Sequence, residues 1–301
     1  MHIWILFVLL LLAAPSSAQT EGYAPTNGLR TYYRSFGQGA PVLIINGGPG
    51  ISSEGFAEIA QLLSKNNRTL IYDQRGTGRS VLVQKDASTI TMAFLADDLE
   101  QLRKHLGYEQ WIVMGHSFGG MLASYYAAHY PDRVKALILS SSGGIDMDLF
   151  SGYRGSVYER LTQTEADSLR YWEGVIARGD TATAARFGRA RSLACAYVYN
   201  RKYAPMIAAR LVQTDQKLNA LVWQDLRRIR FNCAPQLKQF TKPVLILQGR
   251  NDIIDTSAAV KAHRVLRNSR LVLLNHCGHY GWLDQREIYL SEVYAFLKSV
   301  N

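Results

Sequence analysis

Short apolar runs alternate with longer amphipathic stretches along most of this 301-residue chain. The apolar runs have the length of strands and fall at residues 31–35, 42–45, 69–72, 111–114, 134–139, 244–247 and 271–274. The stretches between them place apolar side chains on one helical face, at residues 92–105, 121–129, 258–266 and 287–300. This alternation indicates an α/β fold in which helices flank a mainly parallel sheet.

The alternation stops in the middle of the chain. No strand-like apolar run occurs there, and the pattern predicts helices at residues 164–178, 181–193 and 204–222. We therefore predict a core formed by residues 19–143 and 242–301, with an inserted helical cap at residues 144–241. Because the insertion interrupts the sheet after a strand and its two ends must return close together, the cap should lie over the carboxyl ends of the strands.

The first residues of the chain have the pattern of a signal peptide. An apolar stretch runs from Ile3 to Ala14, and Ser16 and Ala18 occupy the small positions of a cleavage site. Residues 1–18 therefore predict an exported protein, periplasmic or secreted. No Lys or Arg precedes the apolar stretch, which leaves an uncleaved membrane anchor as an alternative. No second apolar run approaches the roughly 20 residues that span a bilayer, so we expect no stable membrane span once the signal is removed.

The chain is basic, and the excess charge is concentrated. Its formal charge is +10, from 34 Lys and Arg against 24 Asp and Glu. Residues 144–242 hold 16 of the basic and 9 of the acidic residues, a net charge of +7. No basic cluster is interleaved with stacking aromatic side chains, so we predict no nucleic-acid partner. A solvated basic face, which would bias the protein toward anionic surfaces or substrates, explains the charge.

Three cysteines in an exported chain leave at least one unpaired. Cys195 and Cys233 both lie in the middle section, and the sequence does not decide whether they form a disulfide. We interpret Cys277 as a packing residue. His276 and His279 have no third ligand near them in the sequence, so we predict no metal site.

A candidate nucleophile follows the apolar run at 111–114. Residues 115–119 are Gly-His-Ser-Phe-Gly and fit the pattern G-x-S-x-G. A strand that turns abruptly into a helix holds such a serine on a strained elbow, with its Oγ exposed. Ser117 is therefore the predicted nucleophile, and the backbone N–H of Phe118 is the first predicted oxyanion donor.

A serine hydroxyl needs a base within reach and a carboxylate that orients the base. Asp252 and His279 each follow a predicted strand, in the chain order Ser, Asp, His. We prefer Asp252 to Asp255 because it lies closer to the strand end. We prefer His279 to His276 because Gly278 lets the backbone turn the imidazole inward. These two residues and the elbow serine form the predicted catalytic triad.

A glycine-rich loop supplies the second candidate oxyanion donor. Residues 46–50, Asn-Gly-Gly-Pro-Gly, follow the predicted strand at 42–45 and expose backbone amides because side chains are nearly absent. An oxyanion hole needs a second N–H group from a loop in this position. Gly48 is our predicted second donor.

Three motifs resemble, in order, the hallmarks of proline iminopeptidases within the α/β-hydrolase superfamily. They are Gly-Gly-Pro-Gly at 47–50, Asp-Gln-Arg-Gly-Thr-Gly-Arg-Ser at 73–80 and Gly-His-Ser-Phe-Gly-Gly at 115–120. The resemblance extends over nearly the whole chain beyond the signal segment. It implies the α/β-hydrolase fold and a serine hydrolase that forms an acyl-enzyme without a cofactor. It also implies that Asp73 and Arg75 are structural residues that hold the loop beside the active site.

In that family, glutamates of the cap bind the free amino terminus of the substrate. Trp172 and Glu173 resemble the segment that supplies one such glutamate, so both are candidate substrate-binding residues. The second glutamate would fall near Ala194, where the sequence has no acid and where Tyr197 is a further candidate. Asn46 stands where the family usually has histidine.

The resemblance therefore predicts an exported serine hydrolase that cleaves short peptides or amino-acid amides from a free amino terminus. The missing cap acid leaves a carboxylesterase, lactonase or C–C bond hydrolase with the same triad as an alternative. A non-catalytic binding protein on the same fold is a third possibility. A small molecule or short peptide is the expected substrate, and the oligomeric state stays open.

Overall fold

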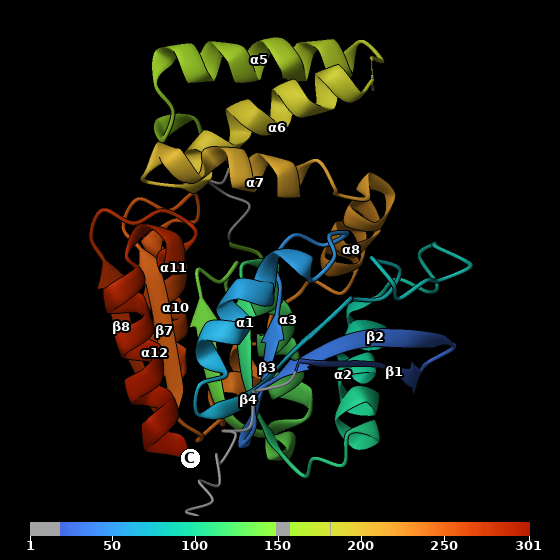
Figure 1. Cartoon of the computed structure of the whole chain (residues 1–301), viewed down its shortest axis with the longest axis vertical. Coiled ribbons are helices and arrows are strands. Elements are labelled where there is room, and N and C mark those ends of the chain that lie inside the picture. The colour runs from blue at the N-terminus through green and yellow to red at the C-terminus, as the bar shows by residue number, and fades with distance from the viewer. Residues whose placement is uncertain (1–18, 149–156, 181) are drawn as a thin grey trace, which may run out of the picture.

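The structure is a computed structural model that describes residues 19–148, 157–180 and 182–301. Its centre is an eight-stranded sheet (Figure 1). The strands lie in the order β1 (Thr20–Thr26), β2 (Leu29–Phe36), β4 (Asn67–Tyr72), β3 (Ala40–Ile45), β5 (Trp111–His116), β6 (Val134–Ser140), β7 (Val244–Gly249) and β8 (Ser269–Leu274). Strands β4 to β8 in this order are parallel, whereas β2 is antiparallel to both of its neighbours. The predicted α/β fold with a mainly parallel sheet is confirmed.

All seven predicted strands are present, and β1 is an eighth that the apolar pattern does not reveal. It lies at the edge of the sheet, largely exposed, and contains Gly22 and Pro25. The turn into β2 passes through Asn27 and Gly28, where φ is 79°. An edge strand needs no continuous apolar run, because only one of its sides pairs and most of its side chains meet water.

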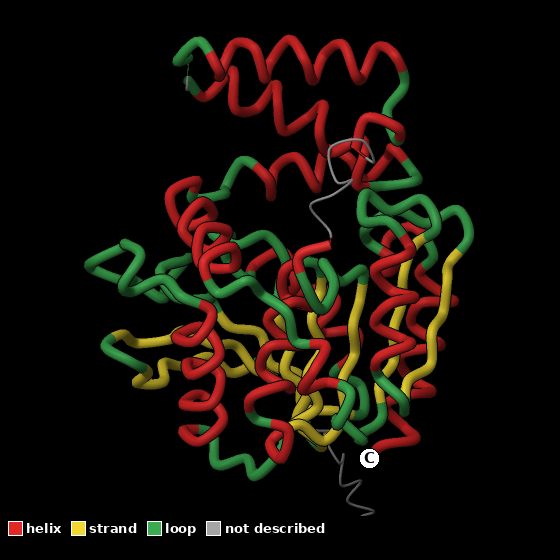
Figure 2. Tube along the Cα trace, turned by 180° about the vertical axis from the view of Figure 1, so that it is seen from behind, coloured by secondary structure: helices red, strands yellow, loops and turns green. Residues whose placement is uncertain are grey.

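Helices cover both faces of the sheet, as Figures 1 and 2 show from opposite sides. One face packs against α1 (Ala57–Leu63) and α12 (Arg286–Val300). The other packs against α2 (Met92–His105), α3 (Phe118–His129) and α10 (Thr256–Val265). Within β5, Ile112 and Met114 join the first cluster and Val113 joins the second. Because both faces are covered, the central strands consist mainly of apolar residues.

A helical cap lies above the ends of the central strands (Figure 1). It consists of α5 (Gln163–Ala177), α6 (Thr183–Tyr197), α7 (Ala204–Leu211) and α8 (Gln216–Arg228), after which the short α9 (Ala234–Leu237) leads back to β7. A capping box starts α5, because the Thr162 hydroxyl accepts from the N–H of Glu165 while the Glu165 carboxylate accepts from the N–H of Thr162. The exact limits of the cap as a domain remain a prediction.

The prediction of a single helix over residues 204–222 was wrong. Helix α7 ends at Leu211, and α8 starts at Gln216. The carboxylate of Asp215 accepts a hydrogen bond from the N–H of Leu218 (3.1 Å). An aspartate in this position satisfies the free N–H groups of a new helix, so the chain turns here instead of continuing.

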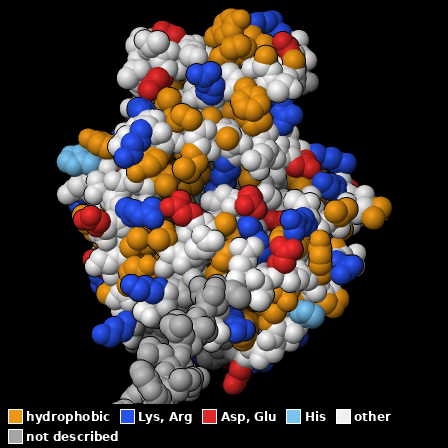
Figure 3. Space-filling view, in the orientation of Figure 1, with side chains coloured by type: hydrophobic (Ala, Val, Ile, Leu, Met, Phe, Trp, Pro, Cys, Tyr) orange, Lys and Arg blue, Asp and Glu red, His pale blue; other side chains and the backbone are white. Residues whose placement is uncertain are grey.

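The predicted signal segment, residues 1–18, lies outside the described residues. No helix in the described part of the chain is long and apolar enough to cross a bilayer. On the face drawn in Figure 3, Lys and Arg side chains are interspersed with Asp and Glu, and they do not gather into one basic patch.

Candidate active site

Ser117 stands at the turn between β5 and α3. Its backbone has φ 56° and ψ −124°, a combination that residues other than glycine rarely adopt. Its N–H is within hydrogen-bond distance of the carbonyls of Ser140 and Ser141 (both 3.1 Å). The turn is so tight that a Cβ on Gly119 would lie 2.2 Å from the carbonyl oxygen of Ile45. This is the strained strand-to-helix elbow that exposes a nucleophile.

The structure brings His279 and Asp252 together. Nδ1 of His279 lies 2.8 Å from Oδ1 of Asp252, and both residues are 1% exposed. Oδ1 of Asp252 also accepts from the N–H of Ile254 (3.0 Å), and Oδ2 accepts from Nε2 of Gln248 (2.8 Å). A carboxylate fixed in this way keeps the imidazole proton on Nδ1, which leaves Nε2 as the acceptor for a proton from another group.

Residues of the cap and of the core hold the histidine loop in place. The N–H of His279 donates to the carbonyl of Tyr197 (2.8 Å), and the two rings meet edge to face with centroids 5.2 Å apart. The Asp284 carboxylate accepts from the N–H groups of Gly278 (2.9 Å) and Tyr199 (2.8 Å). The segment that follows α6 is thereby tied to the loop that carries the imidazole.

The rival residues, Asp255 and His276, are exposed and make other contacts. Asp255 is exposed and caps α10 by accepting from the N–H of Ser257 (2.8 Å). His276 is exposed, and its ring lies 5.2 Å from that of Tyr199.

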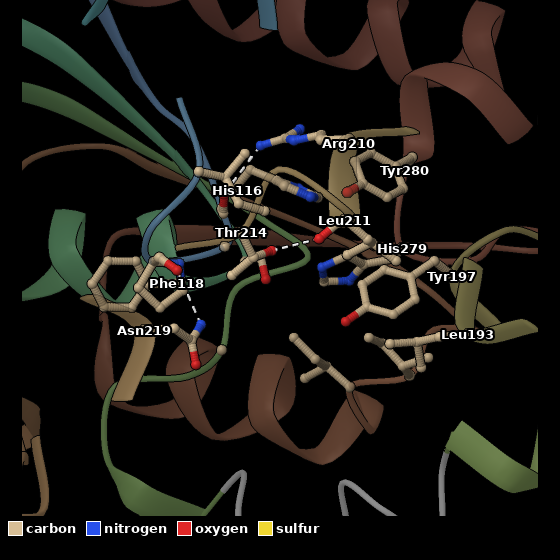
Figure 4. Close-up of a pocket in the computed structure, with 18 of the residues that line it drawn as sticks. His116, Phe118, Leu193, Tyr197, Arg210, Leu211, Thr214, Asn219, His279 and Tyr280 are labelled. Atoms are coloured by element: carbon tan, nitrogen blue, oxygen red, sulfur yellow. Dashed lines mark hydrogen bonds between the residues drawn. The ribbon is translucent and has the colours of Figure 1, made fainter. Parts of the chain in front are cut away.

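Ser117 and His279 line one cavity of about 280 Å³ between the cap and the sheet. Gly48, Phe118 and Tyr197 line it as well. Figure 4 shows His279, Tyr197 and Phe118 around this space. The cavity therefore brings together the predicted nucleophile, base and oxyanion donors with one of the three predicted substrate-binding residues.

The two predicted oxyanion donors come from different segments. Phe118 is the first residue of α3, so its N–H has no acceptor within that helix. Gly48 has φ 74° in the loop after β3. This loop touches the elbow, because a Cβ on Gly47 would lie 2.5 Å from Cβ of Ser117. A carbonyl carbon attacked by the serine would therefore lie close to both donor segments.

The cap also contacts this loop through the α7–α8 connection. Nδ2 of Asn219 donates to the carbonyl of Pro49 (3.0 Å), and the N–H of Asp215 donates to the carbonyl of Gly50 (2.8 Å). A Cβ on Gly50 would lie 2.5 Å from the Asp215 carbonyl oxygen, so the two segments are in close contact.

Trp172 and Glu173 lie elsewhere in the cap. Glu173, on α5, accepts a hydrogen bond from the hydroxyl of Tyr158 (2.9 Å). Trp172 packs over Gly188 and lines a separate cavity. Neither residue is among those that line the cavity of Ser117. Their role in substrate binding remains a prediction.

The lining of the Ser117 cavity has no acidic side chain among the described residues. Two cations, Arg189 and Arg210, line it together with apolar and aromatic groups such as Leu193 and Trp223. The undescribed segments contain no Asp or Glu in their sequence. The cavity therefore differs in charge from a site that would bind a substrate's ammonium group.

Sequence reasoning did not identify Arg210 as part of the site. The residue is 8% exposed, on α7, three positions after the buried Ile207. Residues three apart share a helix face, so this spacing was the available signal.

His116, inside the elbow, is enclosed by other rings. Its centroid lies 4.6 Å from that of His279, 5.0 Å from that of Tyr280 and 4.9 Å from that of Trp282. Burial lowers the pKa of His116 well below its usual value, and positive charge on His279 would lower it further. His116 is therefore a neutral packing residue at physiological pH.

The Asp-Gln-Arg-Gly turn has many internal contacts. Oδ1 of Asp73 accepts from the N–H and the hydroxyl of Ser53 (both 2.8 Å), and Oδ2 accepts from the N–H of Arg79 (2.8 Å). Arg75 forms a buried two-point contact with Asp98, with Nε to Oδ2 at 2.8 Å and Nη2 to Oδ1 at 2.7 Å. These contacts fit the structural role expected for Asp73 and Arg75.

The cysteines form no disulfide, and the described residues hold no metal-binding cluster. Cys195, Cys233 and Cys277 are all free, so Cys195 and Cys233 do not form a disulfide. Across residues 19–148, 157–180 and 182–301, no group of three His, Cys, Asp or Glu side chains is arranged to hold a metal ion.

Comparisons with known proteins agree with this architecture. The family model of the alpha/beta hydrolase fold matches residues 40–285. A proline iminopeptidase of Saccharolobus solfataricus is 26% identical over 292 residues, which cover 93% of each chain. Two solved structures share the fold. Proline iminopeptidase of Mycobacterium smegmatis has a TM-score of 0.73 and 19% identity, and the match covers 93% of this chain and 98% of that chain. The meta-cleavage product hydrolase CumD of Pseudomonas fluorescens has a TM-score of 0.72 and 21% identity, and the match likewise covers 93% of this chain and 98% of that chain. The chain therefore belongs to the alpha/beta hydrolase fold family.

Proposed function

We propose that this protein is a serine hydrolase that works through a covalent acyl-enzyme. Nε2 of His279 takes the proton of the Ser117 hydroxyl as Oγ attacks the substrate carbonyl, and Asp252 stabilises the imidazolium that forms. The N–H groups of Gly48 and Phe118 bind the oxyanion. The leaving group takes the proton from His279, water then attacks the acyl-enzyme with His279 as base, and the free acid is released.

One observation carries this proposal: the hydrogen bond between His279 and Asp252 at a cavity that the strained elbow of Ser117 also lines. A binding protein would have no use for a nucleophile held in a costly backbone conformation beside an oriented imidazole. The non-catalytic alternative is therefore disfavoured.

Labelling with a fluorophosphonate probe and hydrolysis of p-nitrophenyl acetate test the proposal. We expect Ser117→Ala to abolish labelling and to lower kcat by about 10⁴-fold or more. Ser124→Ala is a matched control, because Ser124 is buried on α3 and its hydroxyl has no hydrogen-bond partner among the described residues. Labelling or turnover that survives Ser117→Ala would refute the proposed nucleophile.

For the substrate, the cavity favours a neutral or anionic acyl group over an amino acid with a free amino terminus. An ammonium group would be placed near Arg189 and Arg210 without a carboxylate to pair with, and an unpaired buried charge is costly. Hydrolysis of esters, lactones or activated C–C bonds fits this lining better than aminopeptidase activity.

Aminopeptidase action on proline is the second candidate, and the name of the Saccharolobus relative favours it. A matched pair of substrates separates the two. A peptidase that requires the free amine cleaves proline p-nitroanilide and leaves its N-acetyl derivative intact. Our proposal predicts that p-nitrophenyl butyrate is hydrolysed readily and that N-acetylation does not reduce cleavage of the anilide. Strict dependence on the free amine would establish the aminopeptidase instead.

We also propose that residues 1–18 direct export, on the support of their apolar stretch and small-residue cleavage site. Expression of the full chain in a bacterial host, followed by fractionation and sequencing of the mature amino terminus, tests this. Cleavage after Ala18 is the expected result. Intact protein in the membrane fraction would favour the anchor, and intact protein in the cytosol would contradict export.

A further inference from the structure

Arg210 is a buried cation beside the loop of the oxyanion site. Its Nη2 donates to the carbonyl oxygen of Gly47 (3.0 Å), and its Cζ lies 4.3 Å from the centre of the Phe56 ring. Figure 4 shows the side chain directed toward the region of His116, with a hydrogen bond drawn from its end. The Gly47 contact is therefore the main polar interaction of this guanidinium.

This burial is costly. Nε of Arg210 is buried and has no hydrogen-bond partner among the described residues. None of the described carboxylates forms an ion pair with it, and the undescribed segments contain no Asp or Glu. A charged group without a carboxylate partner in the interior lowers stability, so an apolar residue here would make a more stable fold. A functional role accounts for the presence of arginine.

The geometry of one peptide unit suggests that role. The carbonyl of Gly47 and the N–H of Gly48 belong to the same peptide group, which is trans. In a planar trans peptide, C=O and N–H point in opposite directions. A donor that holds the Gly47 carbonyl on one side therefore fixes the direction of the Gly48 N–H on the other.

Without such a donor this peptide would turn easily. It joins two glycines, and Gly48 already has φ 74°. Glycine adopts positive and negative φ about equally well, so little in the backbone itself prevents rotation of the peptide by half a turn. The rotated peptide would present a carbonyl oxygen, in place of an N–H, to a developing oxyanion.

We infer that Arg210 is a positioning residue of the oxyanion hole, which holds the Gly47–Gly48 peptide so that the Gly48 N–H faces the reacting carbonyl. The inference rests on the proposed serine hydrolase function. Because the donor is charged, it also polarises the peptide and makes the Gly48 N–H a stronger hydrogen-bond donor. The cap thereby contributes to catalysis through α7, although the peptide that it orients belongs to the core.

Asn46 also helps to hold the Gly47–Gly48 peptide in this orientation. Its Nδ2 lies 3.2 Å from the Gly47 carbonyl and 3.1 Å from that of Ile51. This donor is neutral and shared between two acceptors, so it should hold the peptide less firmly than Arg210 does. Loss of Arg210 alone should weaken the oxyanion hole, and loss of both donors should weaken it further.

The test compares Arg210→Met and Arg210→Lys with the unchanged protein in hydrolysis of p-nitrophenyl acetate. Removal of one oxyanion donor costs about 10²- to 10³-fold in kcat. Since Asn46 remains, we expect Arg210→Met to lower kcat by about 10- to 100-fold with little change in KM. Arg210→Lys keeps a charged donor and should therefore have a higher kcat than Arg210→Met. The double variant Asn46→Ala and Arg210→Met should have a lower kcat than Arg210→Met alone.

Arg186→Met is a control for general damage to the cap. Arg186, on α6, donates to the carbonyl of Val212 (2.8 Å) and does not line the Ser117 cavity. We expect this variant to lower the melting temperature without lowering kcat of the folded protein. A kcat for Arg210→Met within twofold of the unchanged protein, or a rise in KM with kcat intact, would overturn the positioning role.

A crystal structure of Arg210→Met gives a readout that does not depend on turnover. We expect the Gly47–Gly48 peptide to rotate or to occupy two orientations. An unchanged, singly ordered peptide would overturn the inference. Failure of the proposed function gives a different result, because the unchanged protein would then show either no turnover or turnover that survives Ser117→Ala, whatever the orientation of this peptide.

Discussion

Oδ1 of Asp252 lies 2.8 Å from Nδ1 of His279, and both residues are excluded from water. Replacing this carboxylate by an amide would favour the wrong imidazole tautomer with little change in shape. We expect Asp252→Asn to lower kcat for p-nitrophenyl acetate by about 10³- to 10⁴-fold, as measured by steady-state kinetics.

The other nearby acid, Asp255, provides the control for that experiment. Its carboxylate caps α10 through the N–H of Ser257. Asp255→Ala should lower the free energy of unfolding by about 1 kcal/mol and leave kcat unchanged. If Asp255→Ala lost activity and Asp252→Asn retained it, the triad would have to be reassigned.

His116 should make stability depend on pH. Burial lowers its pKa in the folded state below the usual value near 6.5, so the unfolded chain binds a proton that the folded protein does not. Stability should therefore fall as the pH drops below about 6.5, with a slope from this one group of up to about 1.4 kcal/mol per pH unit.

His116→Phe keeps a ring in this position and removes the titrating group. In urea unfolding between pH 7.5 and 5.0, the free energy of unfolding should fall less steeply with decreasing pH for this variant than for the unchanged protein. Parallel curves would show that His116 is protonated equally in the folded and unfolded states.

The contact between Arg75 and Asp98 should matter for stability. Both side chains are 2% exposed, so removal of the arginine leaves a buried carboxylate without its partner. We expect Arg75→Met to lower the free energy of unfolding by about 3–5 kcal/mol. Arg170→Met, which breaks the exposed pair with Asp167, should cost at most about 1 kcal/mol. Equal losses in urea unfolding would contradict the structural role of Arg75.

The three thiols should be free and slow to react. Burial raises the pKa of Cys195 to about 11 and that of Cys233 to about 12. At pH 8 only about one Cys195 thiol in a thousand is ionised, and the thiolate is the reactive form. We expect iodoacetamide to label the native protein slowly and to label three thiols after unfolding in the absence of reductant. Labelling of only one thiol under those conditions would indicate a disulfide.

The sequence was most informative where backbone geometry demands particular residues. The elbow around Ser117 requires small neighbours, and the buried parallel strands require continuous apolar runs, so both are visible in the sequence. Asp252 and His279 could be placed because each follows a parallel strand with an apolar run. The edge strand β1 was missed because its environment selects no apolar pattern.

The parts that could not be predicted depend on packing between distant segments. The turn between α7 and α8 is made where Asp215 meets the loop at Gly50, a contact that local periodicity does not encode. For the same reason the sequence did not show that Glu173 does not line the Ser117 cavity, or that Arg210 does. Tertiary packing determines which acidic and basic side chains line a cavity. It therefore also determines the charge of the substrate that the cavity prefers.

The hydrogen bonds between the cap and the core also bear on protein engineering. The carbonyls of Pro49 and Gly50 accept from cap donors, and the Asp284 carboxylate accepts from the N–H of Tyr199. A chimera with the cap of another protein would leave these groups without their hydrogen-bond partners. Each group that stays buried without a partner lowers the free energy of unfolding by about 1–3 kcal/mol. Swapping lids to change selectivity would therefore require the 47–50 loop and Asp284 to be redesigned together with the graft.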